Sequence, residues 1–158
     1  MKGRSEIVAQ RLALALPAAL LAGAYVSQYG FGLFPCEMCW WQRWPHFAAV
    51  ALALASFVIV PQRRVLVALA AGGILTSGLI GAFHAGVEYG WWEGITACAV
   101  TGTPAGSDPL EAILAQPTVS CSQAPWTLAG ISLAGFNALF SIGGAIAIFA
   151  LLAKKNRK

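Results

Sequence analysis

The stretch VLVALAAGGILTSGLIGAFHAGV, residues 65–87, decides the fold class of this chain. It contains no Lys, Arg, Asp or Glu, and it is longer than the roughly 20 apolar residues that a helix needs to cross a bilayer. The whole chain is similar in character, because 58% of its residues are hydrophobic, 10% are charged and its mean hydropathy is +0.70. This composition excludes an ordinary soluble globular domain and predicts a membrane protein.

Three further stretches also lack charged residues and are long enough to span a membrane: residues 12–29, 44–60 and 126–153. Because the hydrocarbon core offers no hydrogen-bond partner to the backbone, these stretches should be helices. The sequence therefore predicts an all-α membrane protein, a bundle of four transmembrane helices that forms one domain over residues 1–158. Frequent glycines in the third and fourth spans predict close helix contacts.

The basic residues predict the orientation of this bundle. Nine of the ten flank the spans on one side, namely Lys2, Arg4, Arg11, Arg63, Arg64, Lys154, Lys155, Arg157 and Lys158. The positive-inside rule makes that side cytoplasmic, with both termini there and with loops 30–43 and 88–125 on the outer side. The net charge of +4 thus follows from topology, and we expect no nucleic-acid partner.

An alternative for the first span is a cleaved signal peptide. Lys2 and Arg4 form a positive segment before it, and Ala22-Gly23-Ala24 resembles a cleavage site. Cleavage would leave the orientation of the later spans unchanged.

The aromatic residues gather on the predicted outer side. All six Trp and all three Tyr lie there: Trp40, Trp41, Trp44, Trp91, Trp92, Trp126, Tyr25, Tyr29 and Tyr89. An ordinary aromatic belt decorates both interfaces, so two interpretations stay open. The aromatic side chains either anchor the outer loops or line a pocket there.

The second outer loop contains one pattern typical of a helix start. In Asp108-Pro109-Leu110-Glu111, Asp108 is suited to cap, Pro109 to the first helical position and Glu111 to a capping box. The pattern predicts a short amphipathic helix on the membrane surface, and a solvated turn is the alternative.

The four cysteines all fall in the two outer loops, at Cys36, Cys39, Cys98 and Cys121. An oxidising compartment permits disulfides, and four cysteines admit three connectivities. Cys36-Glu37-Met38-Cys39 is a C-x-x-C, the spacing of exchangeable redox pairs. Purely structural disulfides and zinc binding are the alternatives, but four-cysteine zinc sites usually show two such motifs. We expect redox chemistry and no metal.

The surroundings of the C-x-x-C favour a reactive thiolate. It opens the second helix, where free amide groups and the helix dipole stabilise an anion, and Cys39 is the better placed of the two cysteines. Arg43 follows one helical turn later and is the only basic residue on the outer side. It is placed to stabilise the thiolate or a reduced electron acceptor, with a lipid phosphate contact as the alternative.

His84 lies in the last turn of the third span, at about the depth of Arg43. It could hydrogen-bond a carbonyl group of an electron acceptor or transfer a proton to it. An ordinary interfacial histidine is the alternative.

Two motifs, FPCEMCWWQR at residues 34–43 and FHAGVE at residues 83–88, occur together with the later pair Cys98 and Cys121 and with the segment 121–137. With these features the chain resembles the disulfide bond formation protein B family over essentially its whole length. The resemblance implies a multi-pass protein of the bacterial inner membrane with its active loops in the periplasm. It also implies a protein-disulfide:quinone oxidoreductase that sustains disulfide formation in secreted proteins.

The resemblance further implies a role for each site residue. Cys98 and Cys121 would form the disulfide that a reduced, DsbA-like thioredoxin-fold partner attacks at Cys98. Exchange between Cys121 and Cys36 would then release Cys39 as the thiolate that contacts the quinone. Arg43 and His84 match positions that the family places at the quinone, which is ubiquinone or menaquinone.

Three alternatives remain. A vitamin K epoxide reductase-like protein also combines four helices, loop cysteines and a quinone, but its C-x-x-C usually lies at the fourth helix. A non-enzymatic membrane protein would use the four cysteines only as structural loop disulfides. A specialised paralogue serving one dedicated thiol partner would carry the same motif. Gln42 stands where an acidic residue is common in the family, which bears on the identity of the partner.

Overall fold

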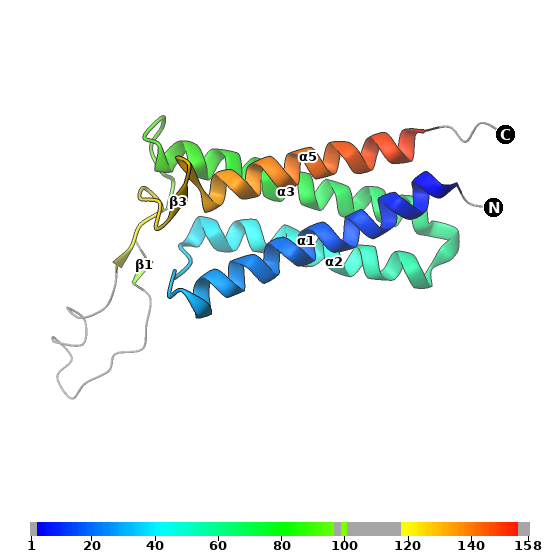
Figure 1. Ribbon diagram of the computed structural model, residues 1–158, viewed down its shortest axis with the longest axis horizontal. Coiled ribbons are helices and arrows are strands. Elements are labelled where there is room, and N and C mark those ends of the chain that lie inside the picture. Colours follow the sequence, from blue (N-terminus) through cyan, green and yellow to red (C-terminus); the bar gives the residue numbers. More distant parts are fainter. Residues whose placement is uncertain (1–2, 97–98, 101–117, 155–158) are drawn as a thin grey trace.

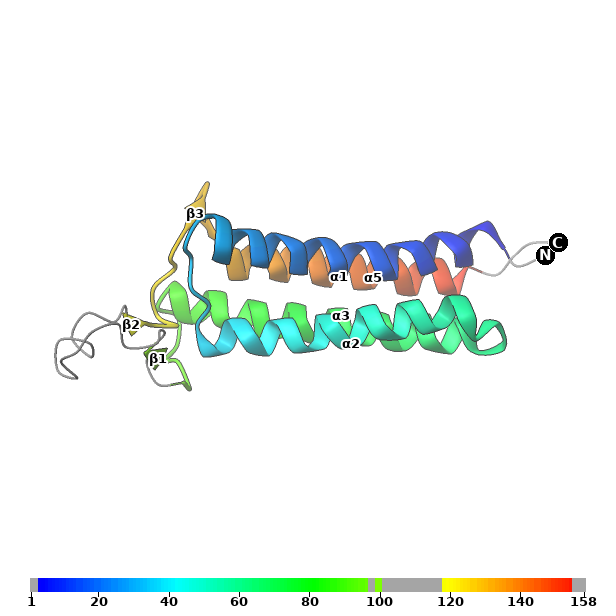
Figure 2. The ribbon, with the colours of Figure 1, turned by 90° about the horizontal axis from the view of Figure 1, so that it is seen from below.

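The computed structural model of the chain describes residues 3–96, 99–100 and 118–154. Its long helices are α1 (Arg4–Gly30), α2 (Glu37–Val58), α3 (Arg63–Glu88) and α5 (Leu133–Ala153), with the short 3-10 helix η1 (Val60–Gln62) before α3. Figures 1 and 2 show the long helices side by side along one axis, with short strands at one end. The predicted helical fold class is confirmed.

Within the described residues, three helical segments are long and apolar enough to cross a membrane: Arg4–Gly30, Val60–Glu88 and Leu133–Ala153. The second half of α2 is equally apolar, but its first half contains Gln42, Arg43 and His46, all of them buried. Large apolar side chains instead face outward, as at Leu69, Leu139 and Ile146. A surface of that kind is suited to lipid, and the helices fit a multi-pass membrane protein.

The helix interfaces are built from small residues. Alanines from all four long helices form the buried core with a few larger side chains: Ala9, Ala13, Ala49, Ala53, Ala70, Ala71, Ala145, Val67, Ile74, Ile148 and Leu152. A Cβ added at Gly78 of α3 would lie 2.9 Å from Ser141 and Ile142 of α5. The prediction that glycines allow close helix contacts therefore holds at Gly78. It does not hold at Gly72 or Gly143, where an added Cβ would meet nothing within 4 Å.

The prediction of a fourth helix beginning at residue 126 was wrong. Residues 127–132 instead form a hairpin of β3 (Thr127–Leu128) and β4 (Ile131–Ser132), and α5 begins at Leu133. The turn residues Ala129 and Gly130 have φ values of 50° and 79°, the positive values that a tight hairpin turn needs. The Ser132 side chain then accepts a hydrogen bond from Gly135 N and caps α5. The lack of charged residues in the stretch 126–153 was therefore not enough to locate the start of this helix.

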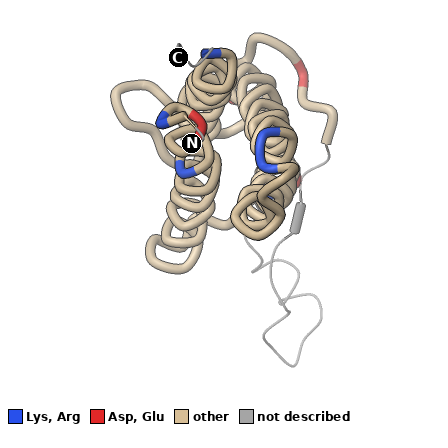
Figure 3. Tube along the Cα trace, turned by 90° about the vertical axis from the view of Figure 1, so that its right-hand side faces the viewer, with Lys and Arg blue, Asp and Glu red and all other residues tan. Residues whose placement is uncertain are grey.

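The start of α1, the end of α5 and the connection between α2 and α3 lie at one end of the bundle (Figure 1). Seen from that end, basic positions lie at the helix termini (Figure 3). Arg64 donates from Nη2 to the Leu152 carbonyl at 2.7 Å, so a cation sits at the last turn of α5, where it is electrostatically favoured. Within the described residues, positive charge is concentrated at the end opposite the cysteines.

At the cysteine end, β1 (Ala99–Val100) pairs with β2 (Thr118–Val119) in antiparallel fashion. Two features of the second loop, Cys98 and the predicted surface helix at Asp108, lie outside the described residues.

Candidate functional site

The C-x-x-C lies where α2 begins. Cys36 is the residue before the helix, and its Sγ accepts a hydrogen bond from Cys39 N at 3.3 Å. The Cys36 thiol in turn donates to Cys39 Sγ at 3.0 Å. Cys36 is buried and Cys39 is half-buried. The first turn of α2 therefore orients both sulfur atoms, with Cys39 as the acceptor of the pair.

The hydrogen bond from Cys36 to Cys39 and the burial of the thiol raise the pKa of Cys36 to about 12. Cys36 thus keeps its proton at neutral pH, and a negative charge on the pair belongs on Cys39. This agrees with the sequence argument that Cys39 is the better placed thiolate.

This arrangement predicts selective alkylation of the reduced protein. From neutral pH up to about 9, the ordinary pKa of a thiol, iodoacetamide is expected to modify Cys39 well before Cys36, because only a thiolate reacts. Replacing Cys39 with alanine removes the acceptor, so Cys36 should then react with an apparent pKa nearer to the ordinary value. Mass spectrometry of peptides alkylated over a pH series measures both. Faster modification of Cys36 than of Cys39 would contradict the assignment.

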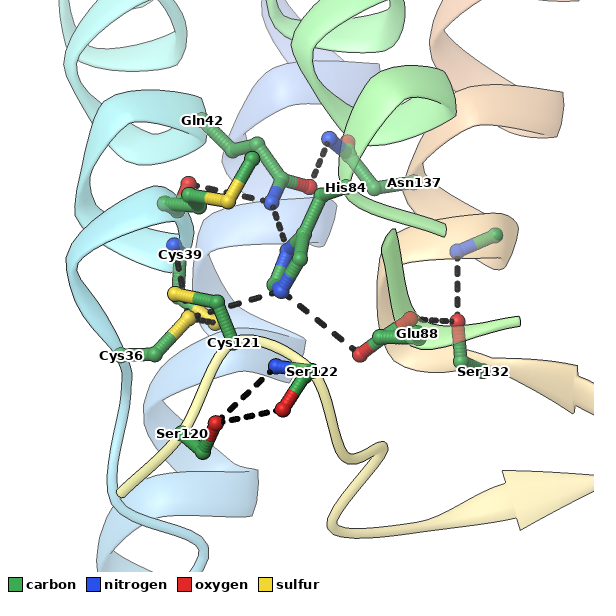
Figure 4. Close-up of polar contacts among 12 residues, drawn as sticks. Cys36, Cys39, Gln42, His84, Glu88, Ser120, Cys121, Ser122, Ser132 and Asn137 are labelled. Carbon is green, nitrogen blue, oxygen red and sulfur yellow. Dashed lines mark hydrogen bonds and ion pairs between the residues drawn. The ribbon is translucent and has the colours of Figure 1, made fainter. Parts of the chain in front are cut away.

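Cys121 comes from the second outer loop and lies against Cys36 (Figure 4). Its sulfur accepts a hydrogen bond from Thr96 Oγ1 at 3.1 Å, and it also contacts the Met38 backbone and the Cys36 side chain. Burial raises the pKa of Cys121. The structure therefore brings three of the four predicted cysteines together, all as free thiols, and Cys98 lies outside the described residues.

His84 approaches these thiols from the last turn of α3. Its Nε2 lies 3.5 Å from Cys36 Sγ, and its Nδ1 lies 2.9 Å from Gln42 Nε2. The ring is 2% exposed. His84 is thus buried beside the C-x-x-C.

A chain of amide groups sets the protonation pattern of His84. Gln42 Oε1 accepts from Asn137 Nδ2 at 2.8 Å, so the Gln42 amide nitrogen is the atom that faces His84 and the Met38 carbonyl. Asn137 Oδ1 accepts from Ser141 Oγ at 2.9 Å. Since Gln42 donates to Nδ1, the neutral ring has its proton on Nε2, directed at the thiols.

Asn137 was missed at the sequence level, although a signal existed. An amide side chain in the charge-free stretch 126–153 is expensive to bury in lipid and marks an internal contact. Gln42 was noted only as a departure from a family pattern, and its link to His84 depends on the packing of α2 against α3.

Arg43 is 6% exposed and lies between two aromatic rings. Its guanidinium carbon is 4.9 Å from the centre of the Tyr25 ring and 4.8 Å from that of Trp40. The guanidinium also donates to Gln28 Oε1 at 2.7 Å and to the Ala24 carbonyl at 3.4 Å. No carboxylate pairs with it among the described residues, and its direct partners are two aromatic rings and two neutral oxygens.

The outer aromatic residues divide between the two interpretations left open by the sequence. Tyr25 and Trp40 enclose Arg43 and belong to the site. Trp44 and Trp91 are 65% and 69% exposed, as expected of anchors at a membrane surface.

A cavity of about 100 Å³ lies among α1, α2, α3 and α5 and joins these groups. Polar residues on its walls include Cys39, Arg43, His46 and His84, with apolar walls from residues such as Phe34. The buried His46 Nδ1 has no hydrogen-bond partner within the described part of the chain. A second cavity of about 280 Å³ adjoins it and is lined by Cys36, Cys39 and His84. In the first cavity, a compact electron acceptor with two polar oxygens would meet hydrogen-bond donors, the unpartnered His46 Nδ1 and the Arg43 cation.

One donor atom from each of Cys36, Cys39 and His84 lies within 4.8 Å of the others, the one such group found among the described residues. Structural zinc sites almost always have four ligands. These three residues alone supply one ligand fewer than that.

Glu88 completes the site, although the sequence argument gave it no role. Its side chain is 2% exposed, and its Oε1 lies 3.8 Å from His84 Nε2. Its Oε2 accepts a short hydrogen bond from Ser132 Oγ. A buried carboxylate at a helix end beside a histidine is a recognisable signal of a functional site.

Comparison with known proteins agrees with this geometry. Residues 8–151 match the family described as disulfide bond formation protein DsbB. The chain is 26% identical over 139 residues to the disulfide bond formation protein B of Marinobacter nauticus, covering 78% of this chain and 77% of that protein. It is also 26% identical over 126 residues to the uncharacterized protein RP370 of Rickettsia prowazekii, covering 77% of this chain and 73% of that protein. No solved structure matches the chain. With a C-x-x-C opening α2 and a third cysteine against it, the chain belongs to the DsbB family of disulfide bond formation proteins.

Proposed function

We propose that the protein reoxidises a periplasmic DsbA-like oxidoreductase by thiol-disulfide exchange and passes the electrons to a membrane quinone. The observation that carries the proposal is the contact between Cys121 of the second loop and Cys36 of the C-x-x-C. It links the second outer loop with a sulfur atom, Cys39, that lines the cavity beside Arg43 and His84.

Exchange begins at a disulfide between Cys98 and Cys121. A thiolate of the reduced partner attacks Cys98 and displaces Cys121 as a thiolate, and the second thiol of the partner then resolves the mixed disulfide. The partner leaves oxidised, and Cys98 and Cys121 hold its two electrons.

The second exchange transfers these electrons to the C-x-x-C. The Cys121 thiolate attacks Cys36 in the Cys36-Cys39 disulfide and displaces Cys39. Cys98 then attacks Cys121, which restores the first disulfide and leaves Cys36 as a thiol. The sulfur with the lower pKa leaves faster, and the raised pKa of Cys36 favours this order.

The energetics require an acceptor beyond ordinary disulfides. A partner of the DsbA type is a strong oxidant at about −120 mV, whereas stable structural disulfides lie below about −300 mV. A gap of about 180 mV would make oxidation of the partner uphill by about 8 kcal/mol. Stabilised thiolates and a terminal oxidant must offset that difference.

The cavity beside Cys39 fits a quinone ring, which as acceptor would take up two electrons and two protons. His84 Nε2 can donate to one carbonyl oxygen, and Arg43 can stabilise negative charge. The orphaned His46 Nδ1 suits a hydroxyl donor, which the reduced ring would offer.

The proposed location is the bacterial inner membrane, with four spans, both termini cytoplasmic and the cysteines in the periplasm. Three apolar helices and the basic residues at the end opposite the cysteines support this topology. α2 would be the fourth span, with its polar first half shielded by neighbouring helices.

The test is quinone reduction by the purified protein in detergent, with a reduced DsbA-like protein as donor and ubiquinone or menaquinone as acceptor. Wild type should turn over, and both Cys39→Ser and Cys98→Ser should abolish turnover. Arg11→Met, at an exposed position near the other end of α1, is the control and should behave as wild type. Absence of turnover with either quinone would reject the proposal in favour of structurally paired loops.

A further inference from the structure

Under the proposed function, the site needs a proton that the thiols do not supply. Oxidation of the Cys36 thiol and the Cys39 thiolate to a disulfide releases two electrons and only one proton, whereas reduction of a quinone to a hydroquinone consumes two of each. The second proton must reach a buried site from outside. We infer that Glu88, which lines the same cavity as His84, carries that proton from the outer aqueous face to the electron acceptor.

Glu88 lies where such a path must pass. It lines three neighbouring cavities in the described part of the chain. Arg43 lines the first cavity, and Cys36 lines the second. The third, of about 710 Å³, is bordered by Tyr89 and Trp91 in the outer loop, and Trp91 is largely exposed. Glu88 therefore stands between the acceptor cavity and the outer surface, with its side chain buried.

The contacts of Glu88 leave one oxygen available for proton exchange. Ser132 Oγ accepts from Gly135 N, so its hydroxyl proton is directed to Glu88 Oε2. Tyr89 Oη accepts from Ser132 N at 3.1 Å, which fixes the hairpin that holds Ser132. Oε1 faces His84 Nε2 at 3.8 Å, a separation that a small movement or one bridging water closes.

The amide chain fixes what His84 can do. Gln42 donates to His84 Nδ1, so the neutral ring has no free nitrogen to accept a proton, and its Nε2–H serves as a hydrogen-bond donor that holds the acceptor oxygen. The Glu88 carboxyl proton therefore passes to the acceptor in the first cavity directly or through one bridging water. Water in the third cavity then reprotonates Glu88. The thiol proton of Cys36 supplies the other hydrogen, and the charges balance.

Other titratable groups face Glu88 from several elements. His84 lies on its own helix, Cys36 and Cys39 lie at the start of α2, and Cys121 lies in the second loop. Arg43 lies across the first cavity. The strand before α5 places Ser132 beside Glu88. From α1, Ala24 and Ser27 line the first cavity. Glu88 is the one carboxylate among the described residues that line the first two cavities.

The experiment compares Glu88→Gln with Glu6→Gln, a glutamate in the first turn of α1 at the opposite end of the bundle. The amide retains an acceptor for Ser132 Oγ but cannot carry a proton. In single-turnover quinone reduction by the pre-reduced protein, Glu88→Gln should be slower by about 100-fold, the usual contribution of a positioned proton donor. The rate of mixed-disulfide formation with the partner should not change. Glu6→Gln should match wild type in both reactions.

A second readout needs no quinone. Infrared titration of the quinone-free, reduced protein should show a carboxyl band that shifts in heavy water, that Glu6→Gln retains and that Glu88→Gln lacks. Glu88→Asp, which keeps the acid on a shorter chain, should retain a band and an intermediate rate. If Glu88→Gln fails to fold, the band and rate of Glu88→Asp decide.

Quinone reduction at the wild-type rate in Glu88→Gln would overturn the inference and leave the proposed function intact. Absence of quinone reduction in wild type would instead reject the proposed function. Loss of partner exchange together with quinone reduction in a folded Glu88→Gln would show a structural role and also overturn the inference.

Discussion

Replacing Arg43 with methionine is expected to slow quinone reduction by about 1,000-fold, the upper part of the range for removing one preorganised group that stabilises developing charge. The guanidinium is buried between Tyr25 and Trp40 and has only neutral partners among the described residues. Its charge is therefore available to an anion in the adjoining cavity. Steady-state kinetics with varied quinone, at a fixed concentration of reduced partner, measures the change in kcat/KM.

The same substitution should not destabilise the fold in proportion. A buried cation without a counterion is costly, and methionine retains the apolar stem that packs against the rings. Arg43→Lys should recover little activity, because an ammonium cannot stack between two rings while bonding Gln28 and the Ala24 carbonyl. A fall in thermal stability that tracks the fall in activity would show that Arg43 acts through packing instead.

Replacing Gly78 with alanine is expected to destabilise the bundle by about 2 kcal/mol, a typical cost of overpacking. The added Cβ would lie 2.9 Å from side-chain atoms of Ser141 and Ile142 and 3.0 Å from Ile142 N. The backbone of α5 cannot rotate away as a side chain can, so α3 and α5 would have to separate. Reversible unfolding in mixed detergent micelles, followed by circular dichroism, measures the change in free energy.

Gly72→Ala is the matched control on the same helix. Its Cβ would meet nothing within 4 Å, and alanine is favoured over glycine in a helix by about 1 kcal/mol. This variant should be as stable as wild type or slightly more so. Equal destabilisation by both substitutions would show that glycine matters here for helix flexibility and not for contact with α5.

Some predictions from the sequence failed because they relied on the absence of charge. Residues 126–132 carry no charged side chain, yet Ala129 and Gly130 turn the chain and Ser132 caps the helix that follows. Local turn and capping chemistry decided that boundary. Conversely, α2 contains Arg43 in its second turn and is still a helix, since its polar first half is buried by α1 and α3.

The sequence by itself determined the helical membrane class, the concentration of basic residues at one end and the C-x-x-C at the start of the second helix. These follow from composition, charge and spacing, which act along a short length of chain. Only the tertiary structure decided that Cys121 lies against Cys36, that Gln42 and Asn137 orient His84, and that Glu88 borders all three cavities. Gln42 and Asn137 are 95 positions apart. Contacts over such separations depend on which helix faces pack together, and small residues such as Gly78 set that packing through distances that no local pattern encodes.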